Sequence, residues 1–404
     1  MDTAQHDSPY SWLRLAISLA LSIMGSIGMW ATIVVLPDIE TEFQISRSAA
    51  TLPYIVTMLS FAAGNLLLGR AVDRWGITPV LIASAIALGI GFGGAYLSSS
   101  IYMIAAFHVF LGLGSASCFG PLIADVSLWF ARRRGIAVAV TASGNYLAGA
   151  IWPPIMARVM EDHGWRGAYL MLGVVVVLTL LPGALLLRRK INAASTARAT
   201  SDAAAKASTT GLSPRRLQTL LALAGIGCCV AMSMPQVHIV ALCIDRGFGM
   251  QAGAEMLSLM LAGGVVSRLV FGAFADRFGG LMTLFVGGTL QMLALCLFLI
   301  EGGLTSLYVV SLIFGLSQGG IVPSYAIIVR EYMPPVEAGK RVGIVIGSTI
   351  LGMALGGWMS GWLYDLSGSY TLAVWNGIGW NAINVTIALI LLARIGPQQS
   401  ARAT

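Results

Sequence analysis

The amino-acid sequence predicts an all-α membrane protein in which twelve transmembrane helices form two six-helix bundles. Three observations lead to this prediction: an apolar composition, twelve apolar runs of membrane-spanning length, and a pattern of six runs that occurs twice. Of the 404 residues, 57% are hydrophobic and 10% are charged, whereas a soluble globular protein has about 25% charged residues. The composition therefore argues against a cytosolic enzyme, a nucleic-acid-binding module and a disordered chain.

Each apolar run is long enough to span a bilayer, because a helix needs about 20 apolar residues to cross a hydrocarbon core of about 30 Å. In the first half the runs cover residues 11–36, 49–71, 78–98, 101–131, 135–160 and 166–188. In the second half they cover residues 215–245, 250–275, 281–301, 304–331, 338–365 and 370–394. The first run is too long for a signal-peptide core and lacks a basic flank, so we expect it to be a helix.

A polar segment separates the two halves. Residues 189–214 are mostly small, polar or basic and cannot bury enough apolar surface to fold alone. We therefore expect a cytoplasmic linker there, between a first bundle at 11–188 and a second bundle at 215–394. Residues 1–10 and 395–404 are expected to be cytoplasmic tails.

The distribution of basic residues predicts the orientation in the membrane. With the linker in the cytoplasm, 19 of the 24 lysines and arginines fall on the cytoplasmic side; the exceptions are Arg47, Arg158, Arg166 and Arg246 outside, and Arg268 within a span. Because basic residues collect in cytoplasmic loops, both termini are expected there, in a bacterial-type inner (plasma) membrane. The same bias explains the net charge of +7 without a nucleic-acid partner.

The two halves repeat each other at a fixed distance. A shift of 203 residues without a gap superimposes four pairs in one short segment: Gly69 on Gly272, Asp73 on Asp276, Arg74 on Arg277 and Gly76 on Gly279. Other glycines, such as Gly112 and Gly315, coincide at the same offset. An internal repeat of six helices is typical of secondary transporters, whose substrates bind near the midplane between the repeats.

The repeated segment follows the second and the eighth run. Residues 69–76 read GRAVDRWG and residues 272–279 read GAFADRFG. The first glycine permits close helix approach, and the aspartate can pair with an arginine or a helix N-terminus; the simpler alternative is an ordinary basic turn. Both segments resemble the loop 2–3 signature of the major facilitator superfamily. This resemblance implies the fold of that superfamily and a gate in which charge pairs break and re-form as the two bundles rock. The arginine that this family places after the second glycine is replaced by Ile77 and Gly280.

A second motif leads into the fifth run. Residues 129–137 read WFARRRGIA, and small residues continue to Gly144. This segment resembles the helix 4–5 signature of the monocarboxylate transporters and the oxalate–formate antiporter group, although basic anchors beside a small-residue packing face are the alternative. The acidic residue of that group is absent from the glycine-rich residues 25–30.

Arg268 is the most informative single residue. It lies eight residues before Asp276, or about 12 Å along a helix from the cytoplasmic loop, where a charge costs several kcal/mol. Residues 267–276 look like the helix 8 segment of the carboxylate transporters, which implies that Arg268 binds the substrate carboxylate. A guanidinium group suits a carboxylate bidentately. A structural pair with Asp125, or extension of the side chain to the interface, is the alternative.

Further candidates come from the helices that line the cavity in this superfamily. The substrate-binding candidates besides Arg268 are Phe119, Gln236, His238, Gln318 and Tyr325. Phe119 replaces a tyrosine that is common in carboxylate transporters. His238 can bind an anion or carry a proton, or simply pack. Asp125 is either a second proton-coupling candidate or a counter-ion for the arginines at 132–134.

Two departures from the family pattern bear on proton coupling and on the charge of the substrate. Gly264 stands where many monocarboxylate transporters have the aspartate thought to carry the coupling proton, and Thr349 stands where the oxalate–formate antiporter has a second cation. One binding arginine without that second cation suits a monoanion better than a dianion.

We therefore expect a secondary transporter that moves a small organic anion, such as a monocarboxylate, by alternating access, with proton coupling or exchange. The alternatives are a drug or metabolite exporter driven by proton antiport, and a receptor or intramembrane enzyme. The sequence contains no Walker lysine, no metal-ligand spacing and no catalytic cluster, so no cofactor or metal is expected. Beyond the anion and protons, the expected partners are membrane lipids, and the expected state is a monomer.

Overall fold

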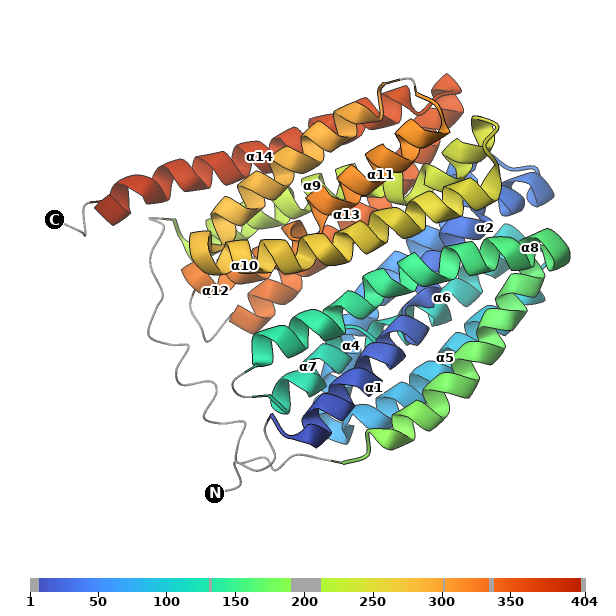
Figure 1. Ribbon diagram of the computed structural model, residues 1–404, viewed down its shortest axis with the longest axis horizontal. Helices are drawn as coiled ribbons and strands as arrows, with labels where there is room; N and C mark the ends of the chain where they lie inside the picture. The colour runs from blue at the N-terminus through green and yellow to red at the C-terminus, as the bar shows by residue number, and fades with distance from the viewer. Residues whose placement is uncertain (1–6, 131–132, 190–211, 301, 334–337, 401–404) are drawn as a thin grey trace. The chain divides into compact units, whose positions relative to one another are not determined.

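The structure is a computed structural model that describes residues 7–130, 133–189, 212–300, 302–333 and 338–400, and no strand occurs among them. The helices before the linker are α1 (Pro9–Gly25), α2 (Ile27–Phe43), α3 (Arg47–Ala50), α4 (Leu52–Trp75), α5 (Ile77–Tyr96), α6 (Ile101–Ser117), α7 (Gly120–Leu128) and α8 (Arg134–Leu186). Those after it are α9 (Pro214–Asp245), α10 (Gly249–Leu297), α11 (Leu304–Gln318), α12 (Ile321–Tyr332), α13 (Ala338–Ser367) and α14 (Thr371–Ser400) (Figure 1).

Over the described residues, every predicted apolar run coincides with one helix or with two successive helices, and the all-helical class is confirmed there. Nine helical stretches among them are long and apolar enough to cross a membrane. Two stretches hold two runs each, because α8 turns back at Gly164 (φ 63°, ψ 178°) and α10 turns back at Gly279 (φ 79°, ψ 166°). Figure 1 shows both helices as pairs of antiparallel arms. The count of twelve spans and the symmetry of two bundles stay predictions.

Two helices break near a proline. The break between α6 and α7 lies just before Pro121, and the break between α11 and α12 lies just before Pro323. Proline has no N–H group, so it cannot bond the carbonyl four residues earlier. The carbonyl oxygens of Ser117 and Gly319 therefore lose their ordinary helical partners.

The backbone repeats at the offset found in the sequence. Left-handed conformations occur at Gln44 (φ 51°) and Gly247 (φ 78°), and unusual positive-φ turns occur at Gly76 (φ 86°) and Gly279 (φ 79°). Both pairs are separated by 203 residues, as are the first residues of α6 and α11. The recurrence of these turns supports an internal repeat.

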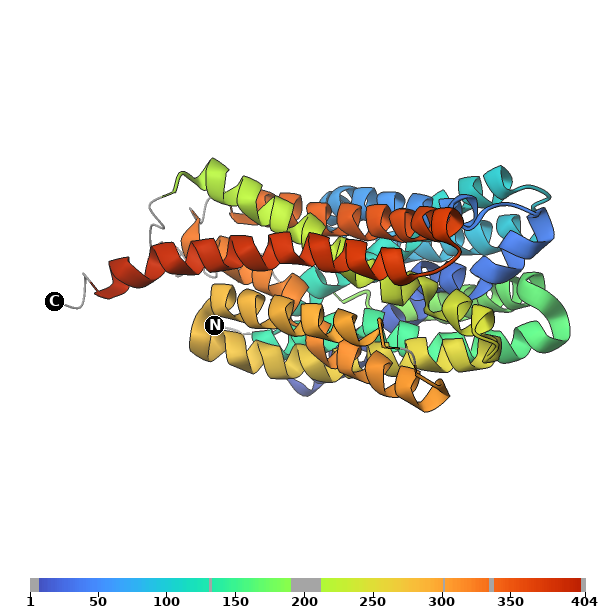
Figure 2. The ribbon, with the colours of Figure 1, turned by 90° about the horizontal axis from the view of Figure 1, so that it is seen from above.

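The chain divides into two compact units. The first comprises Met1–Asn192 and His238–Ala262, and the second comprises Ala193–Val237 and Gly263–Thr404. The divisions thus fall inside α9 and α10 as well as in the linker. Within the first unit α4 packs on α6, α5 packs on α6 and α8, and α1 packs on α8; Figure 2 shows these helices from above.

The second unit has its own apolar core. Buried side chains from α9, α10, α12, α13 and α14 meet there, among them Leu221, Leu284, Tyr325, Val345 and Ala388. The interior of this unit is therefore built by helices that are far apart in the sequence.

We predict that Gly279→Ala destabilises the protein by about 1–3 kcal/mol, because the backbone conformation at Gly279 is one that a side chain strains. Gly347→Ala is the matched control, since Gly347 lies within α13 and a Cβ there meets nothing within 4 Å. Thermal unfolding in detergent measures both effects. Equal midpoints for the two variants would refute the assignment of strain to Gly279.

Candidate functional site

Arg268 lies on α10 where this helix crosses the break between α11 and α12. The Nε of Arg268 is 3.5 Å from the carbonyl oxygen of Gly319, to which it donates. The hydroxyl of the preceding residue, Ser267, accepts a hydrogen bond of 3.0 Å from the Gly319 N–H. The Arg268 side chain is partly buried, so the predicted anion-binding residue is held by the backbone of the broken helix.

A pair of buried glutamines lies next to this break. Gln236 of α9 donates its Nε2 hydrogen to Oε1 of Gln318 at 2.9 Å, and their exposed fractions are 1% and 0%. The Nε2 of Gln318 has no hydrogen-bond partner among the described residues. An unsatisfied buried donor costs about 1–3 kcal/mol, which a carboxylate oxygen or a water molecule would recover. The structure thus brings together two of the predicted substrate-binding residues.

Tyr325 is buried in the interior of the second unit, where its hydroxyl is hydrogen-bonded. Its hydroxyl donates to Oδ1 of Asn384 at 2.9 Å, and Nδ2 of Asn384 donates to Oδ1 of Asn381 at 3.2 Å. A phenol has one hydrogen to donate. The bond to Asn384 therefore has to break before Tyr325 can serve as a donor to a carboxylate.

The remaining substrate candidates belong to the first unit. His238 is completely buried on α9. Phe119 precedes α7 and its ring centroid lies 5.9 Å from that of Phe61. Arg268, Gln236, Gln318 and Tyr325 all belong to the second unit.

Asp125 forms a buried ion pair with Arg14. The Nε of Arg14 lies 2.8 Å from Oδ2 and its Nη2 lies 2.9 Å from Oδ1 of Asp125. The two side chains are only 1% and 11% exposed. The described partner of Asp125 is therefore an arginine in the first turns of α1. Of the basic residues at 132–134, Arg132 lies outside the described residues.

Arg14 also binds the backbone just after the last residue of α8. Its Nη1 donates to the carbonyl oxygens of Leu187 and Arg189, each at 3.2 Å. Its guanidinium carbon lies 4.6 Å from the centre of the Trp129 ring. The pair with Asp125 thus joins α1, α7 and the end of α8. Apart from its position inside the first apolar run, no sequence pattern points to Arg14.

Ion pairs also occupy the predicted outer ends of the helices in the first unit. Arg47 donates from Nε to Glu40 at 2.7 Å and from Nη2 to Asp245 at 3.3 Å. Arg166 donates to Glu42 at 2.7 Å. The first cluster joins α2 and α3 to the last residue of α9, so arginines predicted to lie outside serve as structural ties.

The first copy of the predicted gating motif is described in part. Gly69 and Asp73 belong to α4, but their surroundings lie outside the described part of the chain. Arg74 is exposed, with its guanidinium carbon 5.7 Å from the centre of the Trp75 ring. Gly76 provides the positive-φ turn (φ 86°) into α5.

In the second copy, Gly272, Asp276 and Arg277 are exposed. No atom of its own unit lies within 4 Å of a Cβ built at Gly272, so the close helix approach expected there is absent from the described part of that unit. Instead, both carboxylate oxygens of Glu331 accept from the N–H of Gly280, at 3.1 and 3.3 Å. The helix N-terminus after the Gly279 turn is therefore capped by an acid that sequence analysis did not name.

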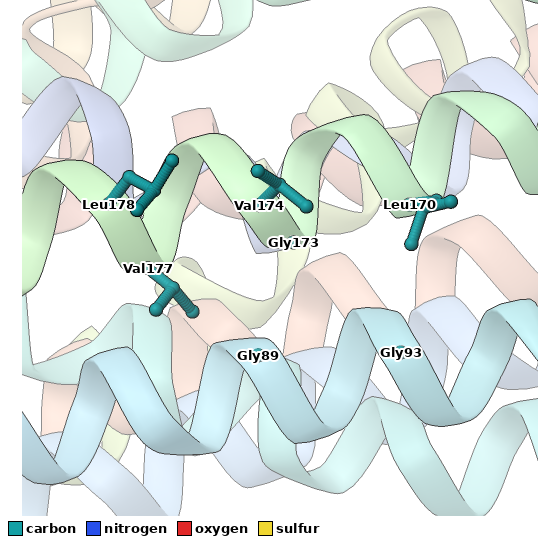
Figure 3. Close-up of a pocket in the computed structure, with 7 residues that line it drawn as sticks. All are labelled: Gly89, Gly93, Leu170, Gly173, Val174, Val177 and Leu178. Carbon is teal, nitrogen blue, oxygen red and sulfur yellow. The ribbon is translucent and has the colours of Figure 1, made fainter.

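One apolar cavity of about 340 Å³ lies between α5 and the second arm of α8. Its lining consists of Gly89, Gly93, Leu170, Gly173, Val174, Val177 and Leu178 (Figure 3). None of these residues carries a polar side chain, so this cavity does not suit an anion and contains none of the predicted site residues.

Comparison with known proteins identifies the group to which this arrangement belongs. The family model described as Major Facilitator Superfamily matches residues 18–267 and 241–403. Monocarboxylate transporter 11 of Homo sapiens is 28% identical over 388 residues, which cover 90% of this chain and 79% of the relative. Monocarboxylate transporter 13 of Rattus norvegicus is 26% identical over 305 residues, which cover 74% of this chain and 69% of the relative.

An exporter is also among the relatives. Agnestins efflux protein AgnL12 of Paecilomyces divaricatus is 23% identical over 331 residues, which cover 81% of this chain and 73% of the relative. Similarity to this chain therefore extends from proteins named for monocarboxylate transport to a protein named for efflux.

The Arg14–Asp125 pair gives a double-variant prediction. Asp125→Asn should destabilise the protein by about 3–5 kcal/mol, because it leaves a buried guanidinium without its counter-charge. Arg14→Met combined with Asp125→Leu should recover most of that loss, since no charge then remains buried. Unfolding midpoints in detergent test this. Additive destabilisation in the double variant would contradict it.

Glu331 gives a pH prediction. Burial raises the pKa of the Glu331 carboxyl above its ordinary value, and the hydrogen bond from Gly280 offsets this only in part. The folded protein therefore favours the protonated acid, so this group lowers stability as pH rises from the unfolded pKa through the folded one. Glu331→Gln should flatten that part of the profile of unfolding midpoint against pH. Glu161→Gln, at an exposed position, is the control, and an unchanged slope in Glu331→Gln would oppose the assignment.

Proposed function

The chain belongs to the major facilitator superfamily, and from this premise we propose that it is a secondary transporter that moves a small monocarboxylate across the membrane. It is an integral, multi-pass membrane protein, and its family consists of transporters rather than enzymes. We propose further that transport proceeds by alternating access and is coupled to protons or to exchange for another anion. In this proposal both termini lie in the cytoplasm and the protein is a monomer.

The observation that carries the proposal is Arg268. It is a cation within the candidate span formed by α10, where a charge is costly and usually functional. Monocarboxylate transporters are among the relatives over most of the chain. A guanidinium group offers two parallel N–H donors that match one carboxylate. Gln318, whose Nε2 has no partner in the described part of the chain, is the second proposed substrate contact.

A single negative charge suits this site better than two. Thr349 occupies the position where a second cation would be expected, and its hydroxyl donates to the carbonyl oxygen of Ile346 at 2.7 Å. Binding of one carboxylate neutralises the positive charge of Arg268. The free-energy cost of enclosing the site is then lower, because the bound pair has no net charge. An anion drives the conformational cycle only if the closed state binds it more tightly than the open states do.

Asp125 and His238 stay the candidates for proton coupling. The Arg14–Asp125 pair makes a purely structural role for Asp125 the simpler interpretation, because a paired carboxylate has to leave its guanidinium to take a proton. The double variant that combines Arg14→Met with Asp125→Leu separates the structural role from proton coupling. It should still transport with a proton gradient if Asp125 is structural.

Uptake into proteoliposomes tests the function. With an inward proton gradient, we expect saturable uptake of at least one labelled short acid, such as lactate, pyruvate or formate. Arg268→Gln should raise the half-saturating concentration about 10- to 100-fold, because charge-assisted hydrogen bonds contribute about 1.5–3 kcal/mol. Arg215→Gln, at an exposed arginine of α9, is the matched control.

Two outcomes would reject the monocarboxylate assignment. The first is an absence of uptake of every acid by folded protein. The second is uptake that Arg268→Gln and Arg215→Gln leave equally unchanged.

The second candidate function is export of a drug or metabolite by proton antiport. The similarity to an efflux protein and the lack of an acid in residues 25–30 favour it. An exporter of lipophilic cations has no need of Arg268, so its substrates should not compete with carboxylates. Competition assays in the same liposomes therefore separate the two functions.

A further inference from the structure

We propose that Gly319 and Ser267 are positioning residues for Arg268: the backbone of the broken helix, brought against α10 by a glycine, sets where the anion-binding guanidinium lies. This inference rests on the proposed role of Arg268 as the carboxylate-binding group. It assigns a function to the break between α11 and α12, for which the sequence motifs give no role.

The first support is the closeness of the crossing. A Cβ added at Gly319 would lie 2.7 Å from the backbone nitrogen of Arg268 and 2.8 Å from Cβ of Ser267, and still closer to the carbonyl oxygen of Gly264. The two nearest of these atoms belong to backbone, which cannot rotate away as a side chain does. Gly319 itself has an ordinary helical conformation (φ −61°, ψ −27°). Alanine would therefore fit the backbone and would act only by pushing α10 away.

The second support is that both polar groups of the Gly319 backbone bond to consecutive residues of α10. The Gly319 N–H donates to the Ser267 hydroxyl at 3.0 Å, and the Gly319 carbonyl oxygen accepts from Nε of Arg268 at 3.5 Å. That carbonyl is available because Pro323, four residues later, has no N–H to donate. Ser267 is only 2% exposed, so its bond is shielded from competing solvent.

The third support is that the residue at the equivalent position of the first unit also bonds the backbone at a helix break, there as an acceptor and four residues further along the broken helix. A shift of 203 residues places Asn65 of α4 on Arg268. Asn65 also bonds the backbone at a helix break, because its Oδ1 accepts from the N–H of Gly120 at 3.1 Å. In each repeat, the second helix thus uses this position to hold the broken fourth helix. In the second repeat that residue also carries the charge.

The consequence concerns orientation of the guanidinium. Its five N–H donors have a fixed planar geometry, so the bond from Nε to Gly319 restricts the directions in which the terminal nitrogens point. Displacement of α10 by a methyl group at Gly319 changes this orientation. Shifts of about 1 Å in such groups can reduce function by about 100-fold.

Transport assays on matched alanine variants test the proposal. Gly319→Ala should raise the half-saturating carboxylate concentration about tenfold, while Gly379→Ala should leave it unchanged, since a Cβ at Gly379 of α14 meets nothing within 4 Å. Ser267→Ala removes one bond without adding bulk and should raise it about fivefold. In an Arg268→Lys background Gly319→Ala should have little further effect, because lysine has no Nε donor to be oriented. An equal effect in both backgrounds would overturn the positioning role.

A second readout does not depend on the substrate. Modification of Arg268 by phenylglyoxal, followed by mass spectrometry, should change at least twofold in rate in Gly319→Ala and in Ser267→Ala, but not in Gly379→Ala. If folded wild-type protein transports no carboxylate, the proposed function fails and this rate alone decides the positioning role. If wild-type protein transports and neither variant differs from Gly379→Ala in either readout, the positioning role fails and the function stands.

Discussion

A guanidinium group inside an apolar helix bundle has to be satisfied by oxygen atoms of the protein, and much of this structure follows from that constraint. Arg14 is matched by the carboxylate of Asp125 and by two main-chain carbonyls. Arg268 donates instead to a neutral carbonyl at Gly319. The first arrangement cancels the charge of Arg14 within the bundle, whereas the bond from Arg268 to Gly319 joins the guanidinium to a group without a formal charge.

Helix breaks supply the oxygen atoms that such groups need. Backbone carbonyls within a regular helix already accept from N–H groups, but a proline four residues later releases one of them. The break before Pro323 provides a partner for Arg268, and the break before Pro121 lies beside Asn65. Glycine completes the arrangement, because only a residue without Cβ lets the neighbouring helix approach the released carbonyl. Irregular backbone at membrane depth is tolerated where protein groups satisfy it.

The names of the relatives indicate that the helical framework does not by itself determine the substrate. Proteins named for monocarboxylate transport and a protein named for efflux both align with most of this chain. The helical framework is therefore compatible with more than one substrate, and the substrate class has to be argued from the polar side chains. Within the second unit, the side chains on which the proposed substrate class rests are Arg268 and the Gln236–Gln318 pair, whereas Tyr325 is bonded to Asn384.

The sequence by itself determined the helical class, the position of the apolar runs and the repeat at 203 residues, and it singled out Arg268 as a candidate, because these depend on local composition and spacing. It also indicated that Gln236 and Gln318 belong to one site, although not that they bond each other. Only the tertiary structure decided which charges pair: Arg14 and Asp125 are separated by 111 residues, and no local pattern relates them. It likewise decided that Asn384 accepts from the Tyr325 hydroxyl and that Glu331 caps the helix at Gly280. Such partners are selected by packing between distant helices, where a buried polar group bonds whatever the fold brings within reach.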